Sequence, residues 1–161
     1  MSGKSQFTFP LHTKVGSSDA SYAELQKQLG SEAEAHAGKI YRLVQAATAD
    51  ALTGRSKVYA WAAFGSYTVD LAGSGDPPCG VQTATQATLA AGDLFWLQIA
   101  GRATVTDDSN TIAANDVVVA AATGDVVTVA DMSLVAEDVV GVALEAFAAN
   151  ATGTVQLRGG L

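Results

Sequence analysis

Several kinds of residue are scarce in this chain of 161 residues, which has one cysteine, two histidines and three prolines. The single thiol, Cys79, excludes an intramolecular disulfide and fits folding in a reducing compartment. Long hydrophobic runs are missing too, because no stretch approaches the ~20 apolar residues that a membrane-spanning helix needs. The first residues lead into no apolar signal-peptide core. We therefore expect no membrane partner and synthesis in a cytoplasm.

The residues that carry chemistry are as sparse as the composition suggests. His12 and His36 have no cysteine or second histidine at ligand spacing, so we expect no metal site. Cys79 has no histidine near it in the sequence and is expected to be a small buried residue rather than a nucleophile. The acidic turn at 107–110 lacks the glycine and the closing glutamate of a calcium loop, which favours a simple polar turn. No glycine-rich loop opens a helix, so a phosphate-binding loop is not expected. With no catalytic apparatus visible in the sequence, we expect no cofactor and no enzyme activity.

Positive charge is also rare in the second half of the chain. The net charge is −7, and Arg158 is the only basic residue after Arg102. An acidic chain is a poor general binder of nucleic acid, whose phosphates need clustered lysine and arginine. Two interpretations of this asymmetry stay open. Acidic loops keep a β domain soluble, or the more basic N-terminal part faces an acidic partner surface.

What the chain does have is alternating apolar and β-branched residues, which are typical of short strands. The expected strands are 40–45, 57–61, 67–71, 79–82, 94–99, 103–105, 117–119, 126–129, 139–144 and 154–158. The predicted fold is mainly β, a small β-barrel or sandwich of roughly eight to ten short strands with an N-terminal extended arm and one short helix. We assign 1–37 to the arm and helix and 38–161 to the β domain.

A pseudo-repeat at 89–129 organises this β domain. Each copy reads as a turn, an apolar strand, a glycine turn and a second strand, and the copies open at 89–93 and 112–116. Asp93 and Asp116 occupy equivalent positions in the two copies. Their recurrence predicts turn chemistry, in which the side chain bonds a nearby backbone donor, rather than a pair of catalytic carboxylates.

The strand at 94–99 is apolar on both faces. Leu94 and Trp96 point to one side, and the residues between and after them point to the other. A strand covered on both sides lies between layers, within a barrel wall or at a subunit contact. Leu94 and Trp96, together with Trp61, are therefore candidates for subunit-interface or core residues.

The first 18 residues are expected to form the extended arm. Phe7, Phe9 and Leu11 alternate with polar residues and Pro10, and exposed apolar side chains on such a segment need a cover. Two alternatives remain: these side chains pack on their own domain, or they pack on a partner.

A short helix is expected after the arm. Ser21 and Glu24 match a capping box, and Tyr22 and Leu25 begin an apolar stripe. Gly30 is placed to end the helix in the left-handed conformation. Residues 31–38 either prolong the helix or form a linker.

From Gly38 onward the chain resembles the head decoration, or cement, proteins of tailed bacteriophages. The matching pieces occur in order at 38–44 (GKIYRLV), 65–69 (GSYTV), 79–81 (CGV), 90–105 (AAGDLFWLQIAGRATV), 140–146 (VGVALEA) and 155–159 (VQLRG). The segment 90–105 is the most distinctive of them. The first 37 residues lie outside the resemblance.

This resemblance implies a structural virion protein rather than an enzyme. Such a protein binds the outside of an expanded capsid as a trimer at threefold and quasi-threefold sites, and stabilises the shell against internal DNA pressure. The implied partner is the major capsid protein, with no direct nucleic-acid contact and with synthesis in the host cytoplasm. We expect Phe7, Phe9 and Leu11 to be the capsid contact, through strand addition to a capsid sheet edge.

Two other functions stay open from the sequence. The chain could be another virion component, such as a tail-tube or head–tail connector protein. It could also be a β module that binds a small ligand or carbohydrate through Trp61, Trp96 and the acidic loops.

Overall fold

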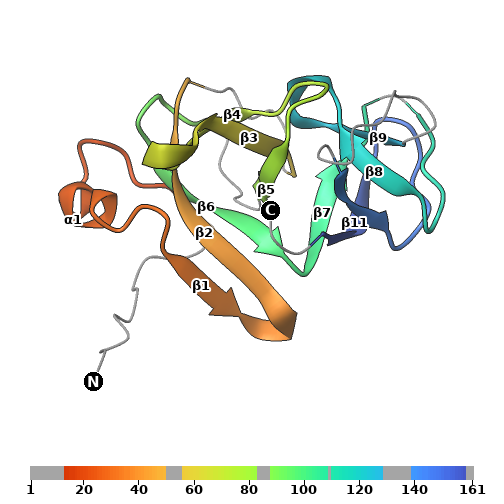
Figure 1. Cartoon of the computed structure of the whole chain (residues 1–161), viewed down its shortest axis with the longest axis horizontal. Coiled ribbons are helices and arrows are strands. Elements are labelled where there is room, and N and C mark those ends of the chain that lie inside the picture. Colours follow the sequence, from red (N-terminus) through yellow and green to blue (C-terminus); the bar gives the residue numbers. More distant parts are fainter. Residues whose placement is uncertain (1–12, 50–55, 83–87, 109, 129–138, 159–161) are drawn as a thin grey trace.

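The computed structural model describes residues 13–49, 56–82, 88–108, 110–128 and 139–158. It confirms a mainly β fold, a sandwich-like arrangement whose sheets do not close into a regular barrel. Figure 1 shows one sheet beside α1 at one end of the long axis and the other sheet at the opposite end.

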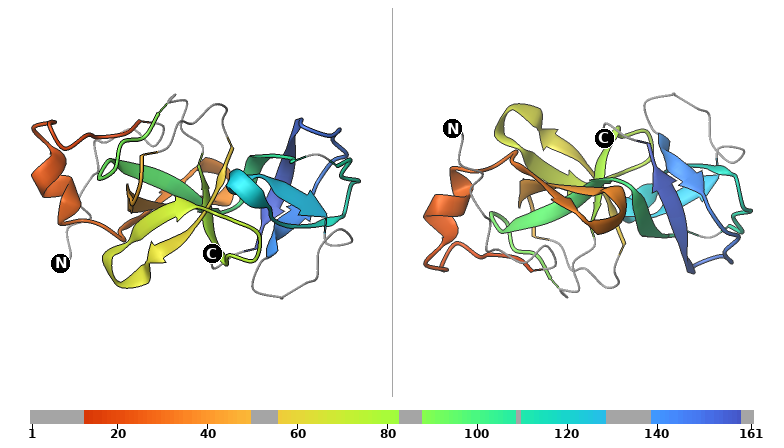
Figure 2. Two further views of the ribbon diagram at one scale, coloured as in Figure 1. Left: turned by 90° about the horizontal axis from the view of Figure 1, so that it is seen from above. Right: turned by 90° about the horizontal axis from the view of Figure 1, so that it is seen from below.

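The two sheets divide the strands by sequence. The first, with strand order β1-β2-β4-β3-β5-β6, contains β1 (Glu32–Ala35), β2 (Lys39–Ala46), β3 (Val58–Ala63), β4 (Thr68–Leu71), β5 (Pro78–Gln82) and β6 (Leu94–Ala100). The second, with strand order β7-β11-β10-β8-β9, contains β7 (Arg102–Thr106), β8 (Val117–Ala120), β9 (Val126–Thr128), β10 (Val139–Ala143) and β11 (Thr152–Leu157). The helical elements are α1 (Tyr22–Gln26), η1 (His36–Gly38), η2 (Phe64–Ser66) and η3 (Ala122–Gly124). The chain crosses between the sheets at the bend from β6 to β7, where Gly101 has a φ of +85° (Figure 2).

Strand β2 holds the first sheet together because it pairs with three others. Its first half pairs with β1, its last residues pair in parallel with β4, and its length pairs antiparallel with β6. Strand β6 also pairs with β5, β5 pairs with β3, and β3 pairs with β4. Because β4 and β6 both pair with β2, the sheet curls round on itself. The result is an irregular ring with β1 attached outside it.

Strand β6 is covered on both faces, as its sequence predicts. Leu94 and Trp96 pack outward on Val15, Leu25, Tyr41 and Leu43. Phe95 and Leu97 pack inward with Val44, Ala46, Tyr59, Val69, Cys79 and Leu89. A separate core, which includes Val58, Val81, Val105, Val118 and Val155, joins residues of the two sheets. Val15, α1 and Leu29 therefore form a third layer over part of the first sheet.

The helix differs from its prediction in two respects. It is only five residues long, and Ser21 makes no side-chain cap hydrogen bond, so the capping box is wrong. Residues 31–38 neither prolong the helix nor form a linker, because they form β1 and η1. Pairing of β1 with β2, reinforced by an ion pair of 2.7 Å between Glu32 and Arg42, outweighs the helix propensity of glutamate and alanine. Gly30 does adopt the predicted left-handed conformation, with a φ of +84°, but it does not end the helix, which stops at Gln26.

The turn chemistry of the pseudo-repeat is confirmed. Asp93 Oδ2 accepts a hydrogen bond of 2.8 Å from the backbone N–H of Ala90, and Asp116 Oδ2 accepts one of 2.9 Å from Ala113. The topology does not repeat, because β6 and β7 lie in different sheets whereas β8 and β9 pair with each other. A similar sequence therefore builds similar turns within different strand connections.

Candidate interaction site at the base of the arm

The N-terminal segment joins the fold at Val15. Its backbone N–H donates to the carbonyl of Leu94, and the N–H of Leu94 donates back to Val15, both at 2.9 Å. The Val15 side chain is only 6% exposed, in the cluster around Trp96. Residues 13–18 therefore belong to the fold rather than to a free arm.

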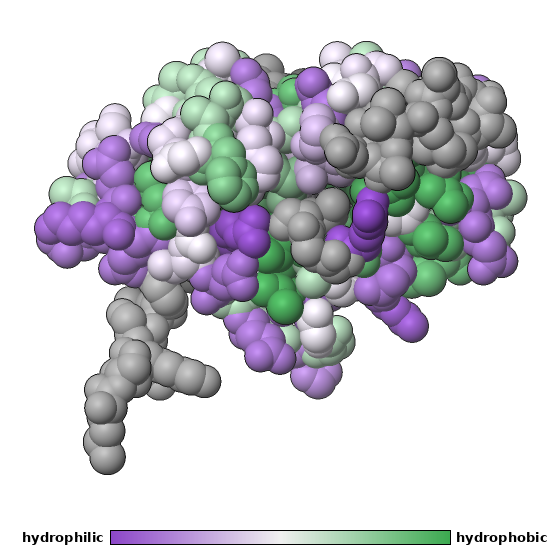
Figure 3. Space-filling model, viewed as in Figure 1, coloured by the Kyte–Doolittle hydropathy of each residue, from purple (hydrophilic) through white to green (hydrophobic). Residues whose placement is uncertain are grey.

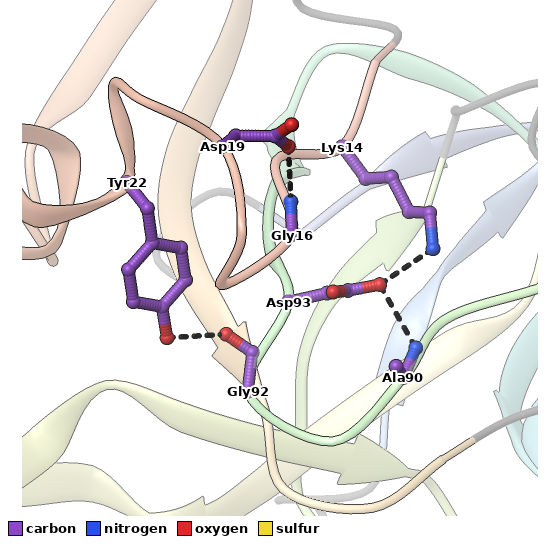
Figure 4. Close-up of polar contacts among 7 residues, drawn as sticks. All are labelled: Lys14, Gly16, Asp19, Tyr22, Ala90, Gly92 and Asp93. Atoms are coloured by element: carbon purple, nitrogen blue, oxygen red, sulfur yellow. Dashed lines mark hydrogen bonds and ion pairs between the residues drawn. The ribbon is translucent and has the colours of Figure 1, made fainter.

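Asp93 ties this segment to the first turn of the pseudo-repeat (Figure 4). Its Oδ2 lies 2.6 Å from Lys14 Nζ and also accepts the backbone bond from Ala90. The Asp93 side chain is 5% exposed and that of Lys14 is 30% exposed. Charge-assisted hydrogen bonds of this length are stronger than neutral ones. The turn that the repeat builds therefore also secures the chain leading to the arm.

Helix α1 is attached at the same place. The Tyr22 hydroxyl donates to the carbonyl oxygen of Gly92 at 2.7 Å, and Gln45 Nε2 donates to the Tyr22 hydroxyl at 2.9 Å. We call Lys14, Val15, Tyr22, Gly92 and Asp93 the arm anchor. Together they connect the segment at Lys14 and Val15 to α1, β2 and the turn before β6 through hydrogen bonds and an ion pair.

A second surface feature lies on the hairpin between β3 and β4. The rings of Trp61 and Phe64 meet edge to face at 5.2 Å, and that of Tyr67 lies 6.0 Å from Trp61. Arg42 Cζ lies 5.8 Å from the centroid of the Trp61 ring, within the range of a cation–π contact. Phe64 is 67% exposed. We call Trp61, Phe64 and Tyr67 the aromatic tip; residues over this hairpin are mostly white to green in Figure 3, unlike the purple residues around α1.

The predicted site residues fall in different places. Leu94 and Trp96 are fully buried within the chain. Trp61 is half-buried in the aromatic tip, so the structure does not bring the two tryptophans to one surface. Phe7, Phe9 and Leu11 lie outside the described residues.

Lys14, Tyr22 and Phe64 are site residues that the sequence pattern does not directly reveal. A signal for Phe64 does exist, because it is a large apolar residue set between alanines on one side and glycine and serine on the other. Lys14 and its partner are far apart in the chain, and no local pattern links them.

The described residues offer little for catalysis. Burial raises the pKa of the Cys79 thiol to about 12, so a thiolate is not available near neutral pH. Within the described ranges no group of three or more histidine, cysteine, aspartate or glutamate side chains is placed to hold a metal ion. His36 is exposed in η1, and His12 lies outside these ranges. No helix in the same ranges is long and apolar enough to cross a membrane.

Asp107, in the acidic turn, is buried rather than solvated. It is 1% exposed, and its Oδ2 accepts a hydrogen bond of 3.2 Å from the backbone N–H of Asn150. Burial raises the pKa of this carboxyl above its usual range. Its contact ties β7 to the turn before β11, which gives the residue a structural position in the second sheet.

Neither a scan against protein-family models nor a search of curated proteins finds a match to this chain. Among solved structures, the N base of the head fiber protein gp8.5 of bacteriophage phi29 is similar, with a TM-score of 0.54 and 15% sequence identity. The match covers 74% of this chain and 94% of the phi29 chain. The fold resembles that of a phage head protein. At this identity the likeness is one of fold alone.

Proposed function

We propose that the chain is a structural protein of a tailed-phage virion that binds the outside of the expanded capsid and stabilises the shell. The likeness of its fold to a head fiber base is the observation that carries this proposal. The trimer, the threefold and quasi-threefold positions and the major capsid protein as partner rest on the sequence resemblance to decoration proteins. Under this proposal the chain is made in the host cytoplasm, acts on the capsid exterior and is not an enzyme.

The stabilisation follows from linkage. A protein that binds the assembled lattice but not free capsid subunits stabilises the lattice by RT ln(1 + [L]/Kd) per site. At a free concentration of ~100 times Kd this is about 2.7 kcal/mol per site, repeated over the shell. A trimer that engages several subunits at once gains further avidity.

The arm anchor supports a role for the arm in this binding. It begins at Lys14 and Val15, so residues 1–12 can be removed without touching its described contacts. The truncated chain should keep its fold and lose most of its capsid affinity, because the proposed contacts Phe7, Phe9 and Leu11 are gone. Co-sedimentation with expanded capsids from a phage lacking this gene would measure this. Equal binding by the truncated and full-length chains would refute the role of the arm, whereas no binding by either would refute the proposed function.

A second candidate is the attachment base of a fiber, which the phi29 neighbour itself favours through its description as a head fiber base. Electron microscopy of capsids decorated with the chain distinguishes the two functions. A compact knob at each site agrees with a decoration protein, whereas attachment at a few sites with bound fibers agrees with a fiber base.

A further inference from the structure

The aromatic tip exposes a single large apolar side chain on a run of small ones. Residues 62–66 are all exposed, and Phe64 is the only one of them larger than serine. No residue from Trp61 to Thr68 carries a charge, although the whole chain has a net charge of −7. A projecting aromatic residue whose neighbours along the hairpin carry no charge has the form of a knob that fits an apolar pocket.

The hairpin presents this side chain rigidly. Tyr67 has a φ of +54°, which bulky residues rarely adopt, and its N–H donates to the carbonyl of Phe64 at 3.2 Å. The Ser66 hydroxyl lies 2.7 Å from Thr68 Oγ1 and 3.3 Å from the carbonyl oxygen of Ala63. A strained conformation persists only when its surroundings hold it, and such strain clusters at functional positions. Rigid presentation lowers the entropy lost on binding.

The aromatic tip and the arm anchor share one end of the molecule. The strand register places the arm anchor and the aromatic tip on one row across adjacent strands. Val15 lies opposite Leu94, which lies opposite Gln45. Gln45 in turn lies opposite Thr68, which lies opposite Ala63 beside the tip. Neighbouring strands are ~4.8 Å apart, so the row is short. The end of the β3–β4 hairpin accordingly lies toward the same end as α1 in Figure 1. A surface that receives the arm is therefore within reach of Phe64.

We propose that Phe64 is a second contact with the capsid, in addition to the arm. Its side chain enters an apolar pocket of the shell protein beside the site that the arm occupies. This inference rests on the proposed function. The composition of the tip fits it, because tryptophan, tyrosine and arginine dominate the energetic centres of protein interfaces. A carbohydrate fits less well, since it needs an open ring face, whereas Arg42 lies over Trp61 and is also paired with Glu32.

The test compares Phe64→Ser with Leu144→Ser in the full chain. Leu144 is 42% exposed and follows β10 in the second sheet, so Leu144→Ser is a control that removes exposed apolar surface away from the tip. Affinity is measured for expanded capsids purified from a phage lacking this gene. Phe64→Ser should weaken binding at least ~10-fold, while Leu144→Ser changes it less than about twofold. Phe64→Leu should recover part of the loss.

Hydroxyl-radical footprinting gives a second readout. Phe64 should be oxidised in the free protein and protected on the capsid. Two results together would overturn the inference and leave the proposed function standing. Phe64→Ser would bind capsids as tightly as the wild type, and Phe64 of the wild-type chain would still be oxidised on the capsid. The inference would also be overturned if Phe64→Ser lost self-association or polysaccharide binding while its affinity for capsids stayed unchanged. A wild-type chain that ignores capsids would refute the proposed function itself.

Discussion

The ion pair between Lys14 and Asp93 should contribute measurably to stability, unlike an exposed pair. The perturbation is a double-mutant cycle of Lys14→Met and Asp93→Asn. Asparagine keeps an oxygen that can accept the hydrogen bond from Ala90, so the cycle removes the charge interaction rather than the turn. The matched control is the cycle of Lys27→Met and Glu24→Gln, a pair whose side chains are 70% and 74% exposed.

The expected magnitude follows from the burial of each pair. Lys14→Met leaves the Asp93 carboxylate, 5% exposed, with a backbone donor but no countercharge. Leaving such a group unpaired should cost about 2 kcal/mol, and the coupling energy of the cycle should be about 1–2 kcal/mol. The exposed control pair should couple by only ~0.3–0.5 kcal/mol.

Urea unfolding followed by tryptophan fluorescence measures both cycles. Trp96 is fully buried in the cluster that contains Val15, so it reports on the layer that the pair secures. In thermal unfolding each kcal/mol should lower the Tm by roughly 2–4 °C for a chain of this size. If the Lys14–Asp93 coupling is no larger than that of the control pair, the ion pair does not secure the arm anchor and this reasoning is refuted.

Three further predictions concern two turns and the core. Alanine at Gly75, whose φ is +86° with open space around it, should cost ~1–2 kcal/mol in a urea titration. Gly30→Ala should cost ~1–3 kcal/mol more, because the added Cβ would lie 2.3 Å from Tyr67 Cζ; equal losses would mean that the ring moves aside freely. Cys79 should resist a thiol reagent at pH 8 in the native protein, because the group is buried and its pKa is about 12, and should react once urea unfolds the chain. Rapid labelling of the native protein would contradict this.

The sequence predicted most strands because alternating apolar residues report directly which side of a strand is buried. The strand β6 is the clearest case, since its continuous apolar run predicted cover on both faces. Strand β1 was missed because glutamate and alanine favour a helix, and only pairing with β2 makes them a strand. Local propensity is a weak guide where a distant partner decides the conformation.

The candidate site was harder to predict than the fold. Asp93 was recognised as a turn residue, but its contact with Lys14 joins residues 79 positions apart and leaves no periodic signal. Trp61 was proposed for its type, and the structure adds the exposed neighbour Phe64 and the strained Tyr67 that positions it. Such positions depend on backbone geometry that no residue pattern in a single sequence specifies.

The three pairings of β2 also constrain the order in which the chain can fold. Leu43 pairs opposite Trp96, and Val15 pairs with Leu94, so the N-terminal segment has no complete partner until β6 has been synthesised. Pairings between distant segments close large loops and slow folding. During translation, the apolar residues of β2 and α1 therefore stay without their final cover while the first two thirds of the chain are made. This delay follows from the connectivity of the fold rather than from weak packing in the finished protein.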